Sequence, residues 1–98
     1  MILLVLVTYD VKTTSKDGRR RLLKVAKICQ NYGQRVQNSV FECVVDGKQF
    51  SQLKSKLKEV VNAKEDSLRF YRLGNHYKGK VEHVGTKAVL DLEEPLIF

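Results

Sequence analysis

The sequence predicts an α+β domain of the ferredoxin-like class, with two helices and four strands. Two observations lead to this prediction. Segments with strand character and segments with helical periodicity alternate in the order strand, helix, strand, strand, helix, strand, which is the βαββαβ pattern. The chain also has only 98 residues, which suffices for one small domain and no more. We therefore assign residues 1–98 to a single domain.

The first strand is expected at residues 2–9, which are apolar in both alternating sets. One set contains Val5 and Val7, and the other contains Leu4 and Leu6. A strand with one face in water would alternate apolar with polar residues, so this strand is expected to be buried on both faces. Two helices can cover only one face of the sheet. We therefore expect a second copy of the chain to cover the other face, in a face-to-face homodimer.

Two amphipathic helices are expected in the chain after this strand. Residues 19–32 show the i, i+3, i+4, i+7 spacing of one apolar face, and Gly33 is expected to end that helix. Asp46 is expected to cap the second helix, because Gln49 stands at the reciprocal position of a capping box. The apolar positions are Leu22, Val25, Ala26 and Cys29 in the first helix, and Phe50, Leu53, Leu57, Val60 and Val61 in the second.

The remaining strands are shorter and less regular. Residues 35–45 read as two short strands joined by a turn or bulge at residues 37–39. Residues 67–73 are expected to form another strand, and residues 81–84 a further short one. The apolar tail at about 91–98 is expected to pack on the partner subunit of the dimer.

The charge balance indicates a polyanionic partner. Lysine and arginine number 18 against 11 acids, which gives a net charge of +7, and such an excess attracts nucleic acid or, with less support, an anionic membrane surface. The sequence contains nothing close to the roughly 18 consecutive apolar residues of a membrane span. It also begins with no basic leader, so we expect a cytoplasmic protein with no membrane partner.

The basic residues gather where anions are already favoured. Several lie at the start of the first helix, where free backbone amides attract phosphate. They offer no evident means of reading base edges, so they suit a nucleic-acid backbone; a merely solvated helix face is the alternative. The residues concerned are Arg19, Arg20, Arg21, Lys24 and Lys27, with Arg35 at the start of the next strand.

Asp10 ends the first strand and can be interpreted in two ways. It can be a turn residue whose carboxylate accepts hydrogen bonds from loop amides, which is the favoured interpretation of a lone aspartate. It can instead be a metal ligand if the dimer axis brings two copies together, since magnesium is usually held by one or two carboxylates. A shared cation there could polarise a phosphodiester and activate water.

Other chemistry finds little support in the sequence. Cys29 and Cys43 belong to no CxxC or Cys/His cluster, so both are expected to be buried thiols rather than zinc ligands. No Ser-His-Asp arrangement with informative spacing is present, and there is no phosphate-binding glycine loop. His76 and His83 stand apart from any such constellation.

The chain resembles the family of CRISPR-associated protein two in several stretches. These are "VTYDV" at residues 7–11, the arginine-rich start of the first helix and "RVQNSVFECVV" at residues 35–45. The stretches "YRLGNHYKGKVEHVG" and "DLEEPLIF" resemble the type I-C branch in particular. The resemblance implies a ferredoxin-like homodimer with a divalent metal at Asp10, magnesium or alternatively manganese. It also implies a metal-dependent endonuclease acting on RNA or duplex DNA, and a DNA-binding bridge for the integrase, CRISPR-associated protein one, during spacer acquisition.

The resemblance also assigns residues. Tyr9 and Asp10 match the active-site end of the first strand, whereas Arg35, Ser39 and Phe41 match polar and aromatic positions of the second strand region. The arginines at 19–21 match a region that contacts DNA phosphates in relatives. Two hypotheses follow: a nuclease that uses a pair of Asp10 carboxylates, and a non-catalytic DNA-binding scaffold of the integrase. A toxin ribonuclease of the VapD kind, whose fold is similar, is a more distant alternative.

Overall fold

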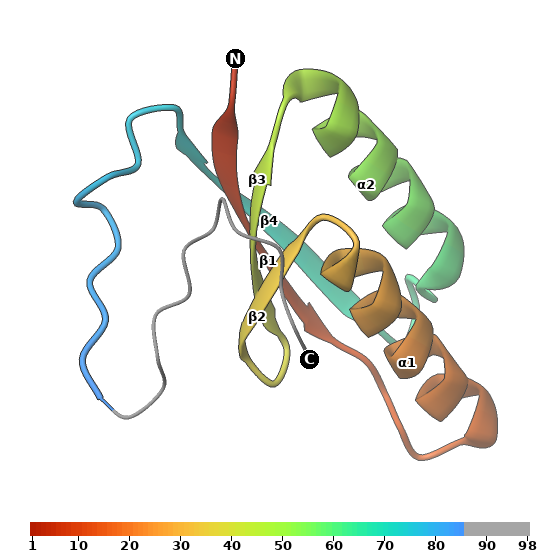
Figure 1. Cartoon of the computed structure of the whole chain (residues 1–98). Coiled ribbons are helices and arrows are strands. Elements are labelled where there is room, and N and C mark those ends of the chain that lie inside the picture. The colour runs from red at the N-terminus through yellow and green to blue at the C-terminus, as the bar shows by residue number, and fades with distance from the viewer. Residues whose placement is uncertain (86–98) are drawn as a thin grey trace.

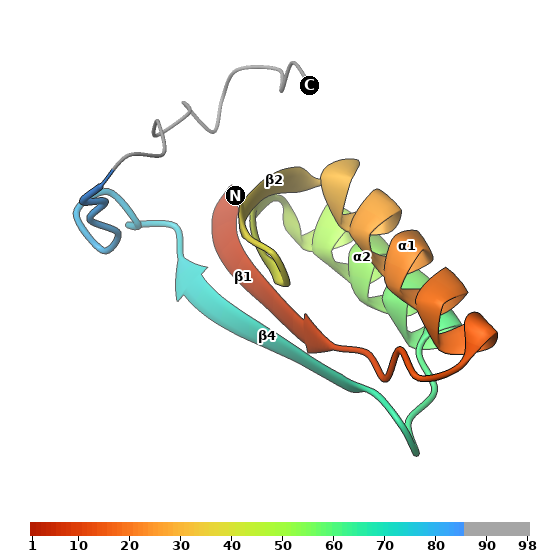
Figure 2. The same ribbon diagram turned by 90° about the horizontal axis from the view of Figure 1, so that it is seen from below.

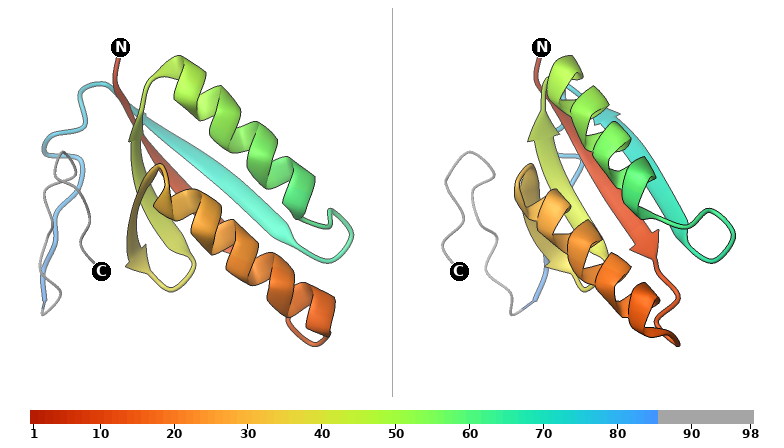
Figure 3. Two further views of the ribbon diagram at one scale, coloured as in Figure 1. Left: turned by 45° about the vertical axis from the view of Figure 1, so that its right-hand side comes forward. Right: turned by 90° about the vertical axis from the view of Figure 1, so that its right-hand side faces the viewer.

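The computed structural model, which describes residues 1–85, confirms the ferredoxin-like fold. Its antiparallel sheet has the strand order β2-β3-β1-β4, so β1 lies inside the sheet (Figure 1). Figures 2 and 3 show both helices side by side on one face of that sheet. The elements are β1 (Leu3–Asp10), α1 (Lys16–Gln30), β2 (Gly33–Gln37), β3 (Val40–Val45), α2 (Gly47–Val60) and β4 (Ser67–Gly74).

Strand β1 is shielded from solvent on both faces of the sheet, as predicted. Val5 and Val7 have no exposed surface and belong to the core beneath the helices. Leu4, which points to the opposite face by strand alternation, is only 1% exposed, and Leu6 is half-buried. The face that lacks helices is called the open face below. The apolar residues in both alternating sets of β1 are therefore explained by its position as a central strand of the sheet.

The core beneath the helices contains both cysteines. Cys29 of α1 and Cys43 of β3 are fully buried together with Phe41, Leu53 and Leu57. Burial raises the pKa of each thiol to about 12, so both remain protonated at neutral pH. The prediction of two buried thiols is confirmed.

Both helices are capped, but the first begins earlier than expected. Helix α2 has the predicted capping box, in which Asp46 accepts from the Gln49 amide at 2.7 Å and Gln49 accepts from the Asp46 amide at 2.9 Å. Helix α1 begins at Lys16 because the Ser15 hydroxyl caps it, accepting from the Gly18 amide at 3.0 Å. Neither helix is long and apolar enough to cross a membrane.

The predicted role of Gly33 as a helix stop is wrong. Helix α1 ends through Asn31, which keeps right-handed helical geometry, and Gly33 is the first residue of β2. A side chain at Gly33 would collide with the Glu42 carbonyl oxygen and with Cys43 of β3. Glycine is therefore required here by the close approach of two strands.

The strand expected at residues 81–84 is also absent. The chain turns at Gly74, which has a positive φ of 78°, and residues 75–85 form turns and irregular structure (Figure 1). Val84 is 96% exposed, and none of the described strands pairs with this segment. The tail expected at about 91–98 lies outside the described residues.

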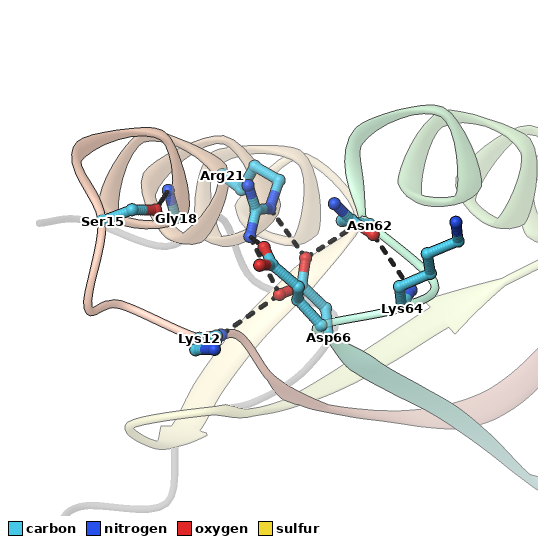
Figure 4. A network of polar contacts seen from close by, with 8 residues as sticks. Lys12, Ser15, Gly18, Arg21, Asn62, Lys64 and Asp66 are labelled. Carbon is cyan, nitrogen blue, oxygen red and sulfur yellow. Dashed lines mark hydrogen bonds and ion pairs between the residues drawn. The ribbon is translucent and has the colours of Figure 1, made fainter.

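An ion-pair network joins the loop after β1 to helix α1 and to the loop between α2 and β4 (Figure 4). Its centre is Asp66, whose side chain has no exposed surface. Its carboxylate accepts from the Arg21 Nε at 2.8 Å, from the Arg21 Nη2 at 3.2 Å, from the Asn62 amide at 2.8 Å and from the Lys12 amide at 3.1 Å. Arg21 also pairs with Glu65 at 3.0 Å. We call Asp66, Arg21 and the amides of Lys12 and Asn62 the clasp.

Replacing Gly33 by alanine should destabilise the fold, because the added Cβ meets strand backbone rather than a flexible side chain. We expect a loss of roughly 1–3 kcal/mol in the free energy of unfolding, measured by denaturant titration. Gly47→Ala is the matched control, since nothing lies within 4 Å of a Cβ at that helix start. Equal stability of the two variants would contradict the close approach.

Replacing Asp66 by asparagine should destabilise the fold at neutral pH by roughly 1–3 kcal/mol, because the partly buried Arg21 guanidinium and two backbone amides lose a charged acceptor. The hydrogen bond from Arg21 is the main reason that the pKa of Asp66 lies below its usual value, and the amides of Asn62 and Lys12 lower it further. A lowered pKa stabilises the folded state above the unfolded pKa, and this gain is lost as pH falls through the folded pKa.

The difference in unfolding free energy between native protein and Asp66→Asn should therefore stay constant near neutrality and shrink below about pH 4. Thermal or denaturant unfolding at a series of pH values measures it. Glu65→Gln is the control and should cost at most about 1 kcal/mol, because the Glu65 side chain is 40% exposed. A difference that persists unchanged into strong acid would contradict the role given to Asp66.

Candidate functional site

Asp10 stands exposed at the end of β1, on the open face of the sheet. Its neighbour Tyr9 points into the core, so alternation directs Asp10 to the other side. Within residues 1–85 the Asp10 carboxylate makes no hydrogen bond or ion pair. The loop amide that a turn-forming aspartate would bind, that of Lys12, is bound instead by Asp66. The interpretation of Asp10 as a turn residue is therefore not supported.

The backbone that presents Asp10 is held on both edges. On the β3 side, Thr8 pairs with Val40 and the Tyr9 amide donates to the Ser39 carbonyl at 3.1 Å. On the β4 side, Asp10 itself pairs with Ser67. The carboxylate therefore extends from a rigid strand end rather than from a loop.

The other predicted residues of this region come together on the helix side of the sheet. The Tyr9 ring stacks on Phe41 with ring centroids 6.2 Å apart, and the Arg35 guanidinium lies 5.3 Å from the Phe41 centroid. The Tyr9 hydroxyl donates to the Asn38 carbonyl at 3.3 Å. Burial is the main cause that raises the pKa of Tyr9, and nearby Arg35 opposes this rise.

This arrangement changes the role predicted for Tyr9. Its side chain is only 5% exposed, its hydroxyl is bonded to the turn between β2 and β3, and it points away from the face that presents Asp10. We therefore regard Tyr9 as a supporting residue that anchors the turn, and no longer as a catalytic one. Ser39 contributes a backbone carbonyl to the same anchor, and Phe41 contributes its buried ring.

The structure separates the predicted arginines. Arg21 belongs to the clasp, with both acidic partners in place, so we remove it from the predicted phosphate-binding set. The Arg19 Nη1 donates to the Thr13 carbonyl at 3.3 Å. Arg20, Lys24 and Lys27 are exposed on α1 and form no hydrogen bond or ion pair with the described part of the chain. Their i, i+4, i+7 spacing places these three on one helix face, called the basic stripe below.

Two functional candidates were missed from the sequence. Asp66 lies 56 positions after Asp10, and no local spacing links it to Arg21 or to the end of β1. Arg69 of β4 is exposed on the open face, where it pairs with Thr8. The alternation of Ser67, Arg69 and Tyr71 in β4 was the available signal for Arg69, because it places all three on the face opposite Leu68 and Phe70.

The donor set is compatible with a hard divalent cation but incomplete in one chain. Among residues 1–85, no group of three or more His, Cys, Asp or Glu side chains is close enough to hold a metal ion. The exposed carboxylate of Asp10 supplies the oxygen ligand that Mg²⁺ or Mn²⁺ prefers. A second carboxylate from another copy of the chain would complete a pair of ligands, with water filling the remaining positions.

Comparison with known proteins shows the family of the chain. The family model of CRISPR associated protein Cas2 matches residues 1–81. The CRISPR-associated endonuclease Cas2 of Halalkalibacterium halodurans is 64% identical over 98% of this chain and 100% of its own length. The CRISPR-associated endoribonuclease Cas2 of Chlorobaculum tepidum is 60% identical over the same shares of the two chains.

Solved structures show the same similarity. Streptococcus pyogenes Cas2 is 52% identical, with a TM-score of 0.73 over 84% of this chain and 99% of that chain. A hypothetical protein from Thermus thermophilus is 29% identical, with a TM-score of 0.74 over 91% of this chain and 98% of the other. With its βαββαβ fold and an aspartate at the end of a buried central strand, the chain belongs to the Cas2 family of CRISPR-associated proteins.

Proposed function

We propose that this protein is a metal-dependent endonuclease that cleaves phosphodiester bonds of duplex DNA or RNA in CRISPR adaptation. One observation supports this most directly: Asp10 is an exposed carboxylate without a structural partner in residues 1–85, held at the end of a rigid strand. Relatives that bear the names endonuclease and endoribonuclease at 60% identity or more support the same activity.

The proposed active form is a face-to-face homodimer. The open face combines half-buried Leu6, Val40 and Val44 with Tyr71, which is 40% exposed. Such a face suits a second sheet of the same kind, related by a two-fold axis. In that arrangement, each subunit contributes one Asp10 to a shared site near the axis.

The residues of the chain divide the proposed work between them. The two Asp10 carboxylates hold the cation, with magnesium as the first choice and manganese as the alternative. When bound, such a cation stabilises developing negative charge on a phosphodiester and lowers the pKa of a water. Strand β1 fixes the direction of each carboxylate in advance, so little ordering remains to be done on binding.

A non-catalytic role is the second candidate, and the position of the basic stripe favours it. Arg20, Lys24 and Lys27 lie on the helix layer, whereas Asp10 lies on the open face. Binding of a phosphate backbone by the stripe therefore does not need Asp10. This suits a scaffold that holds DNA for the CRISPR integrase, CRISPR-associated protein one. The assignment of this chain to the type I-C branch of the family, which rests on residues 71–85 and 91–98, also stays a prediction.

Replacing Asp10 by asparagine should reduce the rate of cleavage at least about 100-fold. This exceeds the roughly 10–100-fold loss that is usual when a residue that only orients a metal ligand is replaced. The substitution keeps the size of the side chain but removes the negative charge that holds a cation. Cleavage of labelled duplex DNA and RNA, with magnesium or manganese, measures the effect.

Asp17→Asn is the matched control for this substitution. It removes an exposed carboxylate from the first turn of α1 without touching β1, and should leave cleavage unchanged. All three proteins should sediment as dimers. Full cleavage by dimeric Asp10→Asn would refute the catalytic role, whereas a native protein that is inert with every metal would favour the scaffold.

Replacing Arg20, Lys24 and Lys27 together by alanine should weaken duplex binding and flatten its salt dependence. Each lost phosphate contact should lower the slope of log affinity against log salt by about 0.9. Binding titrations at several salt concentrations measure this slope. A variant lacking the exposed Lys48, Lys58 and Lys64, which lie outside α1, carries the same charge change as a control. Equal slopes for the two variants would rule out the stripe as the main binding surface.

A further inference from the structure

We propose that Asp66 and Arg21 are positioning residues for Asp10, and that the clasp sets the direction of the metal-binding carboxylate. The inference rests on the proposed function, because it assigns a purpose to Asp10 as a ligand. It adds that this purpose depends on a buried ion pair formed by residues far away in the sequence. Neither Asp66 nor Arg21 is proposed to touch the metal or the nucleic acid.

Asp66 lies next to the end of β1. The β1–β4 ladder ends with the pair Asp10 and Ser67, and Asp66 directly precedes Ser67. The Asp66 carboxylate reaches the Lys12 amide at 3.1 Å, two residues beyond Asp10 (Figure 4). Two successive residues, Ser67 at the start of β4 and Asp66 just before it, therefore hold the backbone on both sides of Val11, the first through a backbone pair and the second through its side chain.

Lys12 is also confined through its carbonyl group. Gly18, in the first turn of α1, is so close to Lys12 that an added Cβ would overlap the Lys12 carbonyl oxygen. Lys12 thus has its amide bound by Asp66 and its carbonyl packed against α1. The segment from Asp10 to Lys12 has little freedom to swing.

Asp66 needs Arg21 as its partner. A carboxylate with no exposed surface is costly unless it is paired and hydrogen-bonded. Arg21 meets this need with two nitrogens, at 2.8 and 3.2 Å from the Asp66 oxygens. The planar guanidinium can do this from a fixed direction, which lysine cannot. Arg21 therefore keeps Asp66 ionised and aimed at Lys12.

The rigidity of the segment from Asp10 to Lys12 should affect metal binding. Mg²⁺ demands near-ideal octahedral geometry with short bonds to oxygen, so a ligand whose backbone drifts loses affinity although its chemistry is unchanged. Groups that orient metal ligands typically contribute 10–100-fold in affinity or activity. We therefore expect a loss of that size when the clasp is opened and Asp10 is left intact.

The test measures Mn²⁺ binding to the purified dimer by calorimetry, together with hydrogen exchange of backbone amides without metal. Both are performed well below the melting temperature of the least stable variant. Asp66→Asn should weaken Mn²⁺ binding about 10–100-fold and accelerate exchange of the Lys12 amide, while duplex affinity and dimerisation stay native. If Asp66→Asn does not fold, Arg21→Lys keeps the charge, loses the planar fork, and should show the same changes in milder form.

The controls separate positioning from general stability. Val45→Ala removes buried volume from the end of β3 that pairs with Leu3, at the opposite end of β1 from Asp10, and should lower the melting temperature without changing Mn²⁺ affinity or Lys12 exchange. Combining Arg21→Lys with Asp66→Asn should weaken Mn²⁺ binding no further than Asp66→Asn alone, because both substitutions open the same clasp.

The outcomes also distinguish this inference from the proposed function. If Asp10→Asn loses Mn²⁺ while Asp66→Asn and Arg21→Lys bind it with native affinity, the positioning role is overturned and the metal site stands. If Val45→Ala loses as much affinity as Asp66→Asn, the effect is one of stability, and the positioning role is again overturned. If Asp10→Asn binds Mn²⁺ like the native protein, or the native protein binds none, both proposals are overturned.

Discussion

The buried carboxylate of Asp66 is the constraint on which the Asp10 end of the molecule depends. Asp10, the start of α1 and the start of β4 meet there at the edge of the core, next to buried Val11 and half-buried Leu68. Four hydrogen bonds from Arg21, Asn62 and Lys12 converge on Asp66. A charge without exposed surface tolerates few arrangements, since each unmade bond is costly. The network therefore adds a fixed polar geometry to the packing of Val11 at this end of the sheet.

The alternation of β1 gives adjacent residues opposite tasks. Tyr9 enters the core and ties the turn between β2 and β3 to the sheet, while Asp10 emerges on the open face. The basic stripe lies on the helix layer, so a bound phosphate backbone and the proposed cleavage site occupy different faces of one subunit. On these proposals, nucleic-acid binding and cleavage should be separable by mutation, and the nuclease and scaffold hypotheses differ only in whether Asp10 performs chemistry.

The sequence predicted the fold well, because its signals are local. The apolar run of β1, the helical stripes and the capping box at Asp46 each lie within one element, and all three are confirmed. The failures share a long-range cause. Gly33 is glycine because β3 comes close, Arg21 is an ion-pair partner rather than a phosphate ligand, and residues 81–84 find no strand to pair with in the described structure. Asp10 was singled out from the sequence as a candidate, but only the structure shows that Asp66 binds the loop amide in its place.

An uncompensated carboxylate is a poor feature for a surface that meets nucleic acid. In a dimer of the proposed kind, two Asp10 side chains would stand near one axis, and a phosphate brought close to them would be repelled by both. A cation between these groups turns that repulsion into attraction, and the rigid backbone from Asp10 to Lys12 prevents the carboxylates from turning away instead. On this reasoning, the clasp has a purpose beyond stability: it keeps two like charges facing the same point, which is useful only if a cation is to be held there.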